Sequence, residues 1–78
     1  MQLTIKYFGM LVEATSISEE QLQIDSCSVS ELVEKLIHQH PKLNKKDFKV
    51  AIDQQLVDRS HVINTNAEIA LLPPFAGG

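Results

Sequence analysis

One amphipathic helix limits the fold of this chain more than any other segment. Ser28 and Glu31 have the spacing of a capping box, in which each side chain accepts a hydrogen bond from the other residue's backbone N–H. Pro41 should end the helix at or just before His40, because a residue that precedes a proline disfavours the helical conformation. Between these limits the apolar residues repeat as one stripe, at Val29, Leu32, Val33, Leu36 and Ile37. A helix with a single apolar stripe needs one sheet face to cover.

Alternating apolar residues predict the strands that supply this face. In residues 2–8, Leu3, Ile5 and Tyr7 fall on one side of a strand, and Phe8 is an apolar exception on the other. The same alternation predicts strands at 17–24, 48–53, 56–57 and 68–72, with loops at 10–16 and 58–67. The order of these elements predicts an α+β fold, a mixed sheet with one main helix packed across one face. The first and last strands should lie side by side in the middle of the sheet.

Length and composition indicate one ordinary domain. The 78 residues are 44% hydrophobic and 22% charged, which is typical of a globular protein and not of a disordered chain. We expect residues 1–72 to form the domain and residues 73–78 to extend from it. The formal net charge of −3 argues against nucleic-acid binding, and no stretch is long and apolar enough to cross a membrane. The lone Cys27 excludes an intrachain disulfide and the N-terminus lacks a secretory signal, so we expect a cytoplasmic location.

No catalytic or metal site is predicted within the domain. His38 and His40 stand two apart on the helix and point in different directions, so they are interpreted as surface residues and not as metal ligands. Cys27 precedes the helix N-terminus, where a thiol pKa can fall, but a single cysteine at such a position is more often a packing residue. Glu19 and Glu20 are interpreted as part of a solvated face.

Several apolar residues fall on the sheet face that is turned away from the helix. Phe8 ends the first strand with outward parity, and Leu72 ends the last strand in the same way. Ala51, Leu56 and Ala70 should lie on the same outer face. Because exposed apolar patches tend to be interaction sites, these residues predict a docking surface. Two alternatives stay open: the strand parity is shifted by one residue, or Phe8 packs under the loop that follows its strand.

The sequence finishes with an apolar strand, two prolines and two glycines, as L-L-P-P-F-A-G-G. Pro73 and Pro74 each fix their own φ and lack an N–H, so the strand should end there and the chain should leave the domain stiffly. Gly77 and Gly78 carry no side chain that would block a narrow partner site. The distinctive functional group of this tail is the α-carboxylate of Gly78, which is unhindered and suited to attack on a nucleotide phosphate. The alternative is an inert, frayed terminus.

The Y-F-G segment at residues 7–9, the capped helix and above all the P-P-x-x-G-G ending resemble the small, sulfur-carrying subunit of molybdopterin synthase, the MoaD family. The likeness covers the whole chain in length and in element order. It implies a ubiquitin-like β-grasp fold, with no cofactor bound by this chain and with Gly77 and Gly78 as the reactive end. The residues that the resemblance assigns to partner binding are Phe8, Leu56, Leu72, Pro73, Pro74 and Phe75.

The resemblance also implies a reaction cycle and its partners. An E1-like adenylating enzyme would activate Gly78 with ATP. A sulfur donor, either a sulfurtransferase or a cysteine desulfurase, would then convert the adenylate into a C-terminal thiocarboxylate. The tail would enter the large catalytic subunit of molybdopterin synthase, within a heterotetramer, and donate sulfur to cyclic pyranopterin monophosphate. On this view the chain carries sulfur and is not an enzyme on its own.

Two positions depart from the family pattern, and three other functions stay open. Relatives often carry an arginine where Val12 stands, so a polar contact with the activating enzyme is in question here. Many also carry Gly-Asp where this chain has Asn66 and Ala67. The other functions are a thiamine-pathway sulfur carrier, a ubiquitin-like modifier joined to target lysines, and an interaction module with an inert tail. The Pro-Pro-Phe approach and the chain length favour the molybdenum-cofactor branch.

Overall fold

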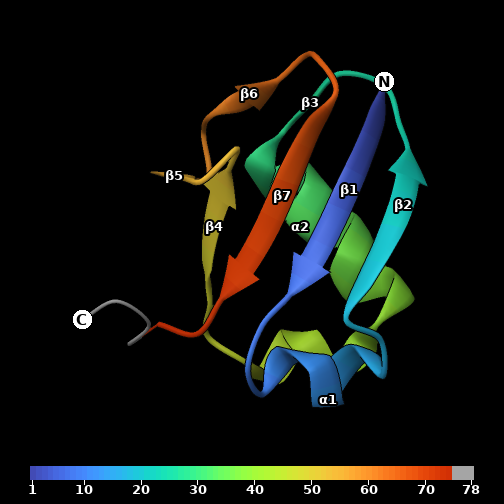
Figure 1. The fold of residues 1–78 in the computed structure, drawn as a ribbon, viewed down its shortest axis with the longest axis vertical. Helices are drawn as coiled ribbons and strands as arrows, with labels where there is room; N and C mark the ends of the chain where they lie inside the picture. The colour runs from blue at the N-terminus through green and yellow to red at the C-terminus, as the bar shows by residue number, and fades with distance from the viewer. Residues whose placement is uncertain (75–78) are drawn as a thin grey trace.

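A mixed five-stranded sheet organises the molecule, and the helix α2 (Val29–Gln39) crosses one face of it (Figure 1). The structure, a computed structural model, describes residues 1–74. The strands follow the order β2-β1-β7-β4-β5 across the sheet. Their bounds are β1 Gln2–Tyr7, β2 Glu19–Gln23, β4 Lys49–Ile52, β5 Gln55–Val57 and β7 Ala67–Leu72. This arrangement confirms the predicted α+β class, a β-grasp fold with one main helix on one face.

The strands β1 and β7 are parallel neighbours in the middle of the sheet, as the sequence predicts. Their register pairs Ile5 with Ile69 and Tyr7 with Leu71. The other pairings in this sheet are antiparallel. Because β1 and β7 are parallel, both strands finish at the same end of the sheet. The chain that follows Leu72 therefore leaves the sheet beside the residues that follow Tyr7.

The helix α2 begins and ends where the sequence indicates. Ser28 Oγ accepts a hydrogen bond from the Glu31 N–H at 3.1 Å, and the Glu31 carboxylate accepts one from the Ser28 N–H at 2.9 Å. These two bonds complete the predicted capping box. His40 is the C-cap, and the 3₁₀ helix η1 (Pro41–Lys45) follows directly.

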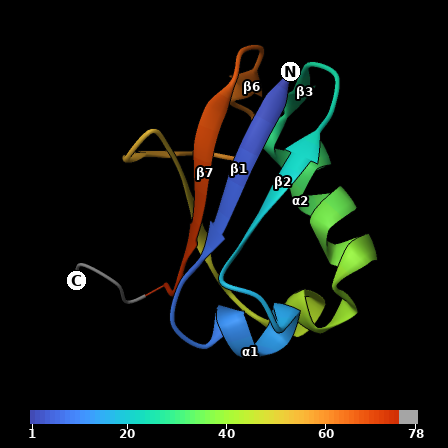
Figure 2. The same ribbon diagram turned by 45° about the vertical axis from the view of Figure 1, so that its right-hand side comes forward.

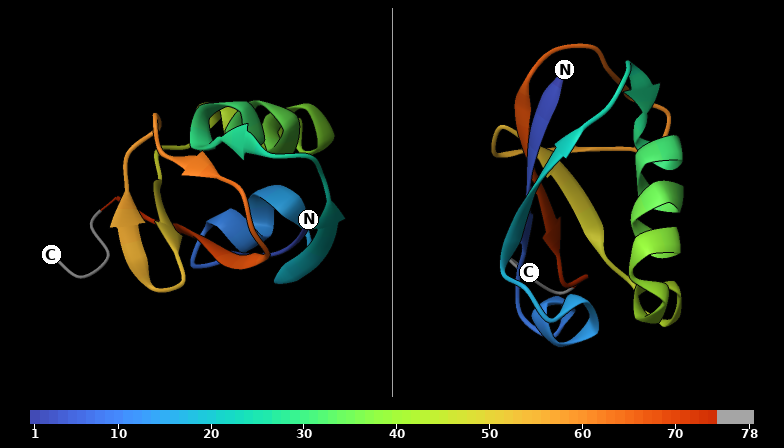
Figure 3. Two further views of the ribbon diagram at one scale, coloured as in Figure 1. Left: turned by 90° about the horizontal axis from the view of Figure 1, so that it is seen from above. Right: turned by 90° about the vertical axis from the view of Figure 1, so that its right-hand side faces the viewer.

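The core lies between α2 and the inner face of the sheet. Figure 3 shows the helix lying alongside this face in the edge-on view. The apolar stripe of α2 and the inward residues of β1 and β7 meet there, so the strand parity predicted from alternation is confirmed. The side chains with no exposed area are Leu3, Ile5, Leu11, Val29, Leu32, Leu36, Leu43, Ile69 and Leu71.

The segment 10–16, predicted as a loop, contains the short helix α1 (Leu11–Thr15). It closes the end of the core at which β1 and β7 finish (Figure 2). Met10 offers no side-chain cap, and five residues are too few for a helical apolar repeat to be visible in the sequence. Leu11 is fully buried, which shows that tertiary packing holds this helix. Ser16, at φ +68°, ends it in the left-handed conformation.

A second, two-stranded sheet was also absent from the sequence prediction. The strand β3 (Cys27–Ser28) pairs antiparallel with β6 (Val62–Ile63), which lies inside the predicted loop 58–67. Backbone bonds join the start of α2 to this loop, because the Val29 N–H donates to the His61 carbonyl at 2.9 Å. No helix within residues 1–74 is long and apolar enough to span a membrane.

Candidate functional site

The outer face of the sheet carries the apolar patch that alternation predicts. Phe8 follows the last residue of β1 and is 43% exposed, and Leu56 on the edge strand β5 is 62% exposed. Leu72 is half-buried at the end of β7. Between these positions Ala51 pairs with both Ala70 and Leu56 across the strands. We call these five residues the outer-face patch.

The structure decides between the alternatives for Phe8. Tyr7 is buried and the next residue, Phe8, is exposed, so the strand parity is not shifted by one residue. Phe8 also does not pack under the segment that follows it, because Phe8 stays exposed. That segment is α1, and its buried residues are Leu11, Ala14 and Thr15. Ala51 is 5% exposed although it faces outward, because its strand neighbours cover so small a side chain.

Charged residues border the outer-face patch. The Lys6 ammonium lies 3.3 Å from the Glu68 carboxylate on the same face. The Lys6 side chain is 36% exposed and the Glu68 side chain 42%. A pair this exposed contributes little to stability, typically about 0–1 kcal/mol. Lys49 stands opposite Leu72 in the register of β4 and β7. The patch is therefore an apolar centre with a polar rim, the usual anatomy of a protein interface.

The tail begins at the edge of this patch. Pro73 is half-buried directly after β7, and Pro74 is exposed in a turn. The other predicted tail residues, Phe75, Gly77 and Gly78, lie outside the described residues. Phe8, Leu72 and the start of the tail thus lie at the same end of the sheet, the end at which β1 and β7 both finish (Figure 1).

A shallow hollow of about 420 Å³ adjoins the patch at the junction of β1, α1 and β2. Phe8, Gly9 and Val12 line it on one side, and Ser18 and Glu19 on the other. Val12 is half-buried on α1, at the position where the MoaD-like pattern often has arginine. A partner surface that reaches this hollow therefore meets an apolar wall.

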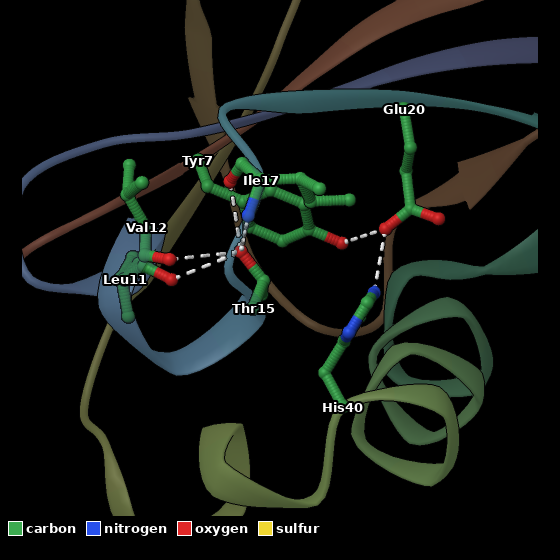
Figure 4. A network of polar contacts seen from close by, with 7 residues as sticks. All are labelled: Tyr7, Leu11, Val12, Thr15, Ile17, Glu20 and His40. Carbon is green, nitrogen blue, oxygen red and sulfur yellow. Dashed lines mark hydrogen bonds and ion pairs between the residues drawn. The ribbon is translucent and has the colours of Figure 1, made fainter.

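A polar cluster inside this same end of the molecule corrects two of the sequence interpretations. Glu20 is not part of a solvated face, and His40 is not a surface residue: the Glu20 carboxylate lies 2.7 Å from His40 Nε2 and accepts the Tyr7 hydroxyl at 2.6 Å (Figure 4). The Tyr7 and His40 rings meet edge to face, with centroids 5.8 Å apart. Glu20 is two residues from Leu22 on β2, so both side chains lie on the face of the sheet that is turned toward the core. The alternation in the sequence therefore already indicated an inward position for Glu20.

The cluster ties β1, β2 and the end of α2 together directly behind Phe8. Burial, and then the hydrogen bond to the Glu20 carboxylate, raise the pKa of Tyr7 above its ordinary value. Nearby, the buried Thr15 hydroxyl lies 2.9 Å from the Ile17 carbonyl and 3.2 Å from the Leu11 carbonyl, and so fixes the turn between α1 and β2 (Figure 4). These contacts join β1, α1, β2 and the end of α2 at the end of the sheet that carries Phe8.

The remaining candidates do not form a reactive site. Burial raises the pKa of the Cys27 thiol, so the cysteine stays protonated near neutral pH and fits the packing interpretation. Within residues 1–74, no three His, Cys, Asp or Glu side chains come together in a way that could hold a metal ion.

A β-grasp domain with an apolar outer-face patch beside its chain exit has the architecture of a ubiquitin-like carrier protein. The family comparison gives the same answer more specifically. The ThiS family matches residues 5–78, so the chain belongs to the ThiS family. With its MoaD-like relatives, this family contains small sulfur carriers and ubiquitin-like modifiers.

Solved structures share the whole fold at low sequence identity. A candidate molybdopterin converting factor subunit 1 from Pyrococcus furiosus has a TM-score of 0.87 at 18% identity, over 95% of this chain and 98% of that one. The modifier SAMP1 from Haloferax volcanii has a TM-score of 0.83 at 20% identity, with both chains covered completely. A chain of the complex of subunits 1 and 2 of the molybdopterin-converting factor from Helicobacter pylori has a TM-score of 0.70 at 20% identity, again over both full lengths. At these identities the likeness establishes the fold.

Proposed function

We propose that this chain is the sulfur carrier for molybdenum cofactor biosynthesis, the small subunit of a molybdopterin synthase. The observation that carries the proposal is the position of the outer-face patch, because its residues Phe8 and Leu72 lie at the end of the sheet where the tail begins. A carrier must dock on a partner and at the same time deliver its terminus into the partner's site. A patch at the tail exit meets both requirements with one surface.

Two comparisons support the proposal. The family match extends through Gly78, the residue that would carry the sulfur. One of the similar folds belongs to a complex between subunits 1 and 2 of a molybdopterin-converting factor, and that protein therefore works with a partner subunit. By analogy, this chain would bind a large catalytic subunit through Phe8, Leu56 and Leu72 and would place Pro73, Pro74 and Phe75 along the entrance to its site.

The chemistry would take place at the Gly78 carboxylate. An oxygen of this carboxylate attacks the α-phosphorus of ATP in an E1-like activating enzyme, and pyrophosphate leaves. The outer sulfur of a persulfide on a sulfurtransferase or a cysteine desulfurase then displaces AMP and forms an acyl disulfide. A second thiol of the partner enzyme cleaves this acyl disulfide, which releases the thiocarboxylate and leaves a disulfide on the partner. Gly77 and Gly78 present no side chain near the reacting carbonyl, so the carbonyl is open to both attacks. The acid, base and phosphate-binding groups belong to the partner enzymes.

Adenylation of the tail tests this proposal directly. The protein is incubated with the activating enzyme of its own host, and ATP–pyrophosphate exchange is followed. Deletion of Gly78, or addition of one residue after it, should abolish the exchange because the reacting carbonyl must reach one fixed depth. Val62→Ala, which changes an exposed apolar residue on β6 far from the tail, should leave exchange unchanged. Normal exchange by the lengthened tail would refute the proposed chemistry.

A ubiquitin-like modifier is the second candidate, because the fold is also similar to SAMP1 from Haloferax volcanii, with a TM-score of 0.83. A modifier would form an isopeptide bond between Gly78 and lysines of target proteins. A carrier would instead leave free protein with a terminal thiocarboxylate. A thiamine-pathway carrier, the third candidate, would also carry a thiocarboxylate but would bind a thiazole-forming enzyme. Binding to the large synthase subunit separates this candidate from the molybdenum-cofactor carrier.

A further inference from the structure

Gly9 lies directly against the first residue of the tail. The pairing of β1 with β7 continues one residue past Tyr7, because the Phe8 N–H donates to the Leu71 carbonyl at 3.2 Å. This contact brings Gly9 alongside Pro73 at the end of the sheet where both strands finish. A Cβ placed on Gly9 would stand 2.9 Å from Pro73 Cγ and 3.8 Å from Pro73 Cδ. The first of these distances is too short for two carbon atoms that are not bonded to each other.

Gly9 also has a backbone conformation that other residues rarely adopt. Its φ is +60°, in the left-handed region where a Cβ is unfavourable. The backbone on either side of it is fixed, because the Leu11 N–H donates to the Phe8 carbonyl at 3.2 Å and the Val12 N–H to the Gly9 carbonyl at 3.1 Å. Leu11 is fully buried. A side chain at Gly9 would therefore strain its own backbone and would also press against the Pro73 ring.

A displaced Pro73 ring would redirect the tail. Pro73 has a fixed φ, and Pro74 holds it in an extended conformation, so the two residues transmit a shift instead of absorbing it. The tail ends four residues after Pro74, at Gly78. A displacement at Pro73 would change the direction in which the chain leaves the sheet, and so the way the tail approaches a partner site.

We propose that Gly9 is a positioning residue for the tail: its bare α-carbon leaves room for the Pro73 ring, and this contact sets the direction in which the chain leaves the sheet. The inference rests on the proposed carrier function. It gives two neighbouring residues different roles. Phe8 contributes contact area for docking, and Gly9 sets the direction in which the chain leaves the sheet. Changes at Gly9 should accordingly lower the rate of the reaction more than the affinity for the partner.

The test is a double-mutant cycle between Gly9 and Pro73. Gly9→Asn is the first variant, because asparagine tolerates a positive φ better than most residues and still carries a Cβ. Pro73→Ala removes Cγ and Cδ, the atoms that this Cβ would meet. In the Pro73 background, Gly9→Asn should lower kcat for ATP–pyrophosphate exchange by about tenfold or more, since misplacement by about 1 Å can cost on the order of 100-fold. In the Ala background the same change should cost less than about threefold, with KM for the carrier near its starting value in both.

Ser28→Ala controls for stability, because it removes the helix cap at the opposite end of the molecule and should leave kcat unchanged. An equal loss from Gly9→Asn in both backgrounds would overturn the inference, because the loss would then come from the backbone and not from the ring. A normal kcat for Gly9→Asn would overturn it as well.

NMR separates a failure of this inference from a failure of the proposed function. The wild-type protein should give cross-peaks between the Gly9 α-protons and the Pro73 ring protons, and Gly9→Asn should lose the packing that they report. If the wild-type protein lacks these cross-peaks, the contact does not exist, whatever the chemistry of the tail. If the cross-peaks are present but the wild-type protein supports no exchange, the proposed function fails and the positioning role fails with it.

Discussion

Replacing Phe8 with alanine should weaken docking far more than folding. Phe8 is 43% exposed in the free chain, and a phenylalanine side chain offers roughly 200 Å² of surface, so about 85 Å² remains for a partner to cover. At about 25 cal/mol per Å², burial of this area contributes about 2 kcal/mol to binding. Because every 1.4 kcal/mol is tenfold in affinity, Phe8→Ala should bind the large synthase subunit about thirtyfold more weakly.

The folding effect of the same change should be small. Phe8 lies outside the buried cluster that α2 and the sheet form, so its loss opens no cavity in the core. We expect a destabilisation of about 1 kcal/mol or less, in the ordinary range for point mutations. High concentrations of the large subunit should restore sulfur transfer, because the Gly78 end is untouched.

Calorimetric titration and a urea melt on the same sample decide this prediction. Val62→Ala is the matched control, because Val62 is 57% exposed and apolar but lies on β6, outside the outer-face patch. It should bind normally. If Phe8→Ala binds normally and melts early, Phe8 supports the fold and the docking argument is wrong. If Val62→Ala weakens binding as much as Phe8→Ala, the partner does not use the outer-face patch specifically.

Two further predictions concern stability. Leu36→Ala should destabilise the fold by about 2–5 kcal/mol, because it is a large-to-small change at a fully buried site. Ser28→Ala should destabilise it by about 1 kcal/mol, because the helix loses its N-cap. Equal stabilities of the two variants in urea melts would contradict the assigned helix faces. The pKa of Tyr7 is raised, so the folded state binds the phenol proton more tightly than the unfolded state does. The free energy of unfolding should therefore stay constant up to about pH 10 and decrease above it, by up to about 1.4 kcal/mol per pH unit. Tyr7→Phe should remove this alkaline loss, and unchanged pH slopes would show that another group causes it. Since Tyr7 is the only tyrosine, its ultraviolet absorbance reports the titration directly.

The sequence predicted the elements whose signal is local and repeated. The stripe on α2 and its capping box require only residues three and four apart, and Ser28 with Glu31 behaves as that spacing indicates. Alternation in β1 and β7 fixed which residues face the core. Because side chains alternate strictly along a strand, the same rule predicts that Phe8 and Leu72 lie on the outer face.

The features that the sequence did not reveal depend on contacts between distant segments. The helix α1 is too short to show a repeat and is held by the burial of Leu11. The strands β3 and β6 have two residues each and pair across more than thirty positions of sequence. The contact of Glu20 with His40 joins residues 20 apart, and charge alone suggested that both were exposed. The contact of Pro73 with Gly9 likewise exists only because β1 and β7 are parallel neighbours.

The most direct test of the carrier function is the intact mass of the protein purified from its own host. The account predicts a species heavier by the difference between one sulfur and one oxygen atom, with the change located at Gly78 by fragmentation. The species should disappear when the activating enzyme is deleted. A tail that always carries a free carboxylate, or that is found only in isopeptide linkage to lysines of other proteins, would contradict the account.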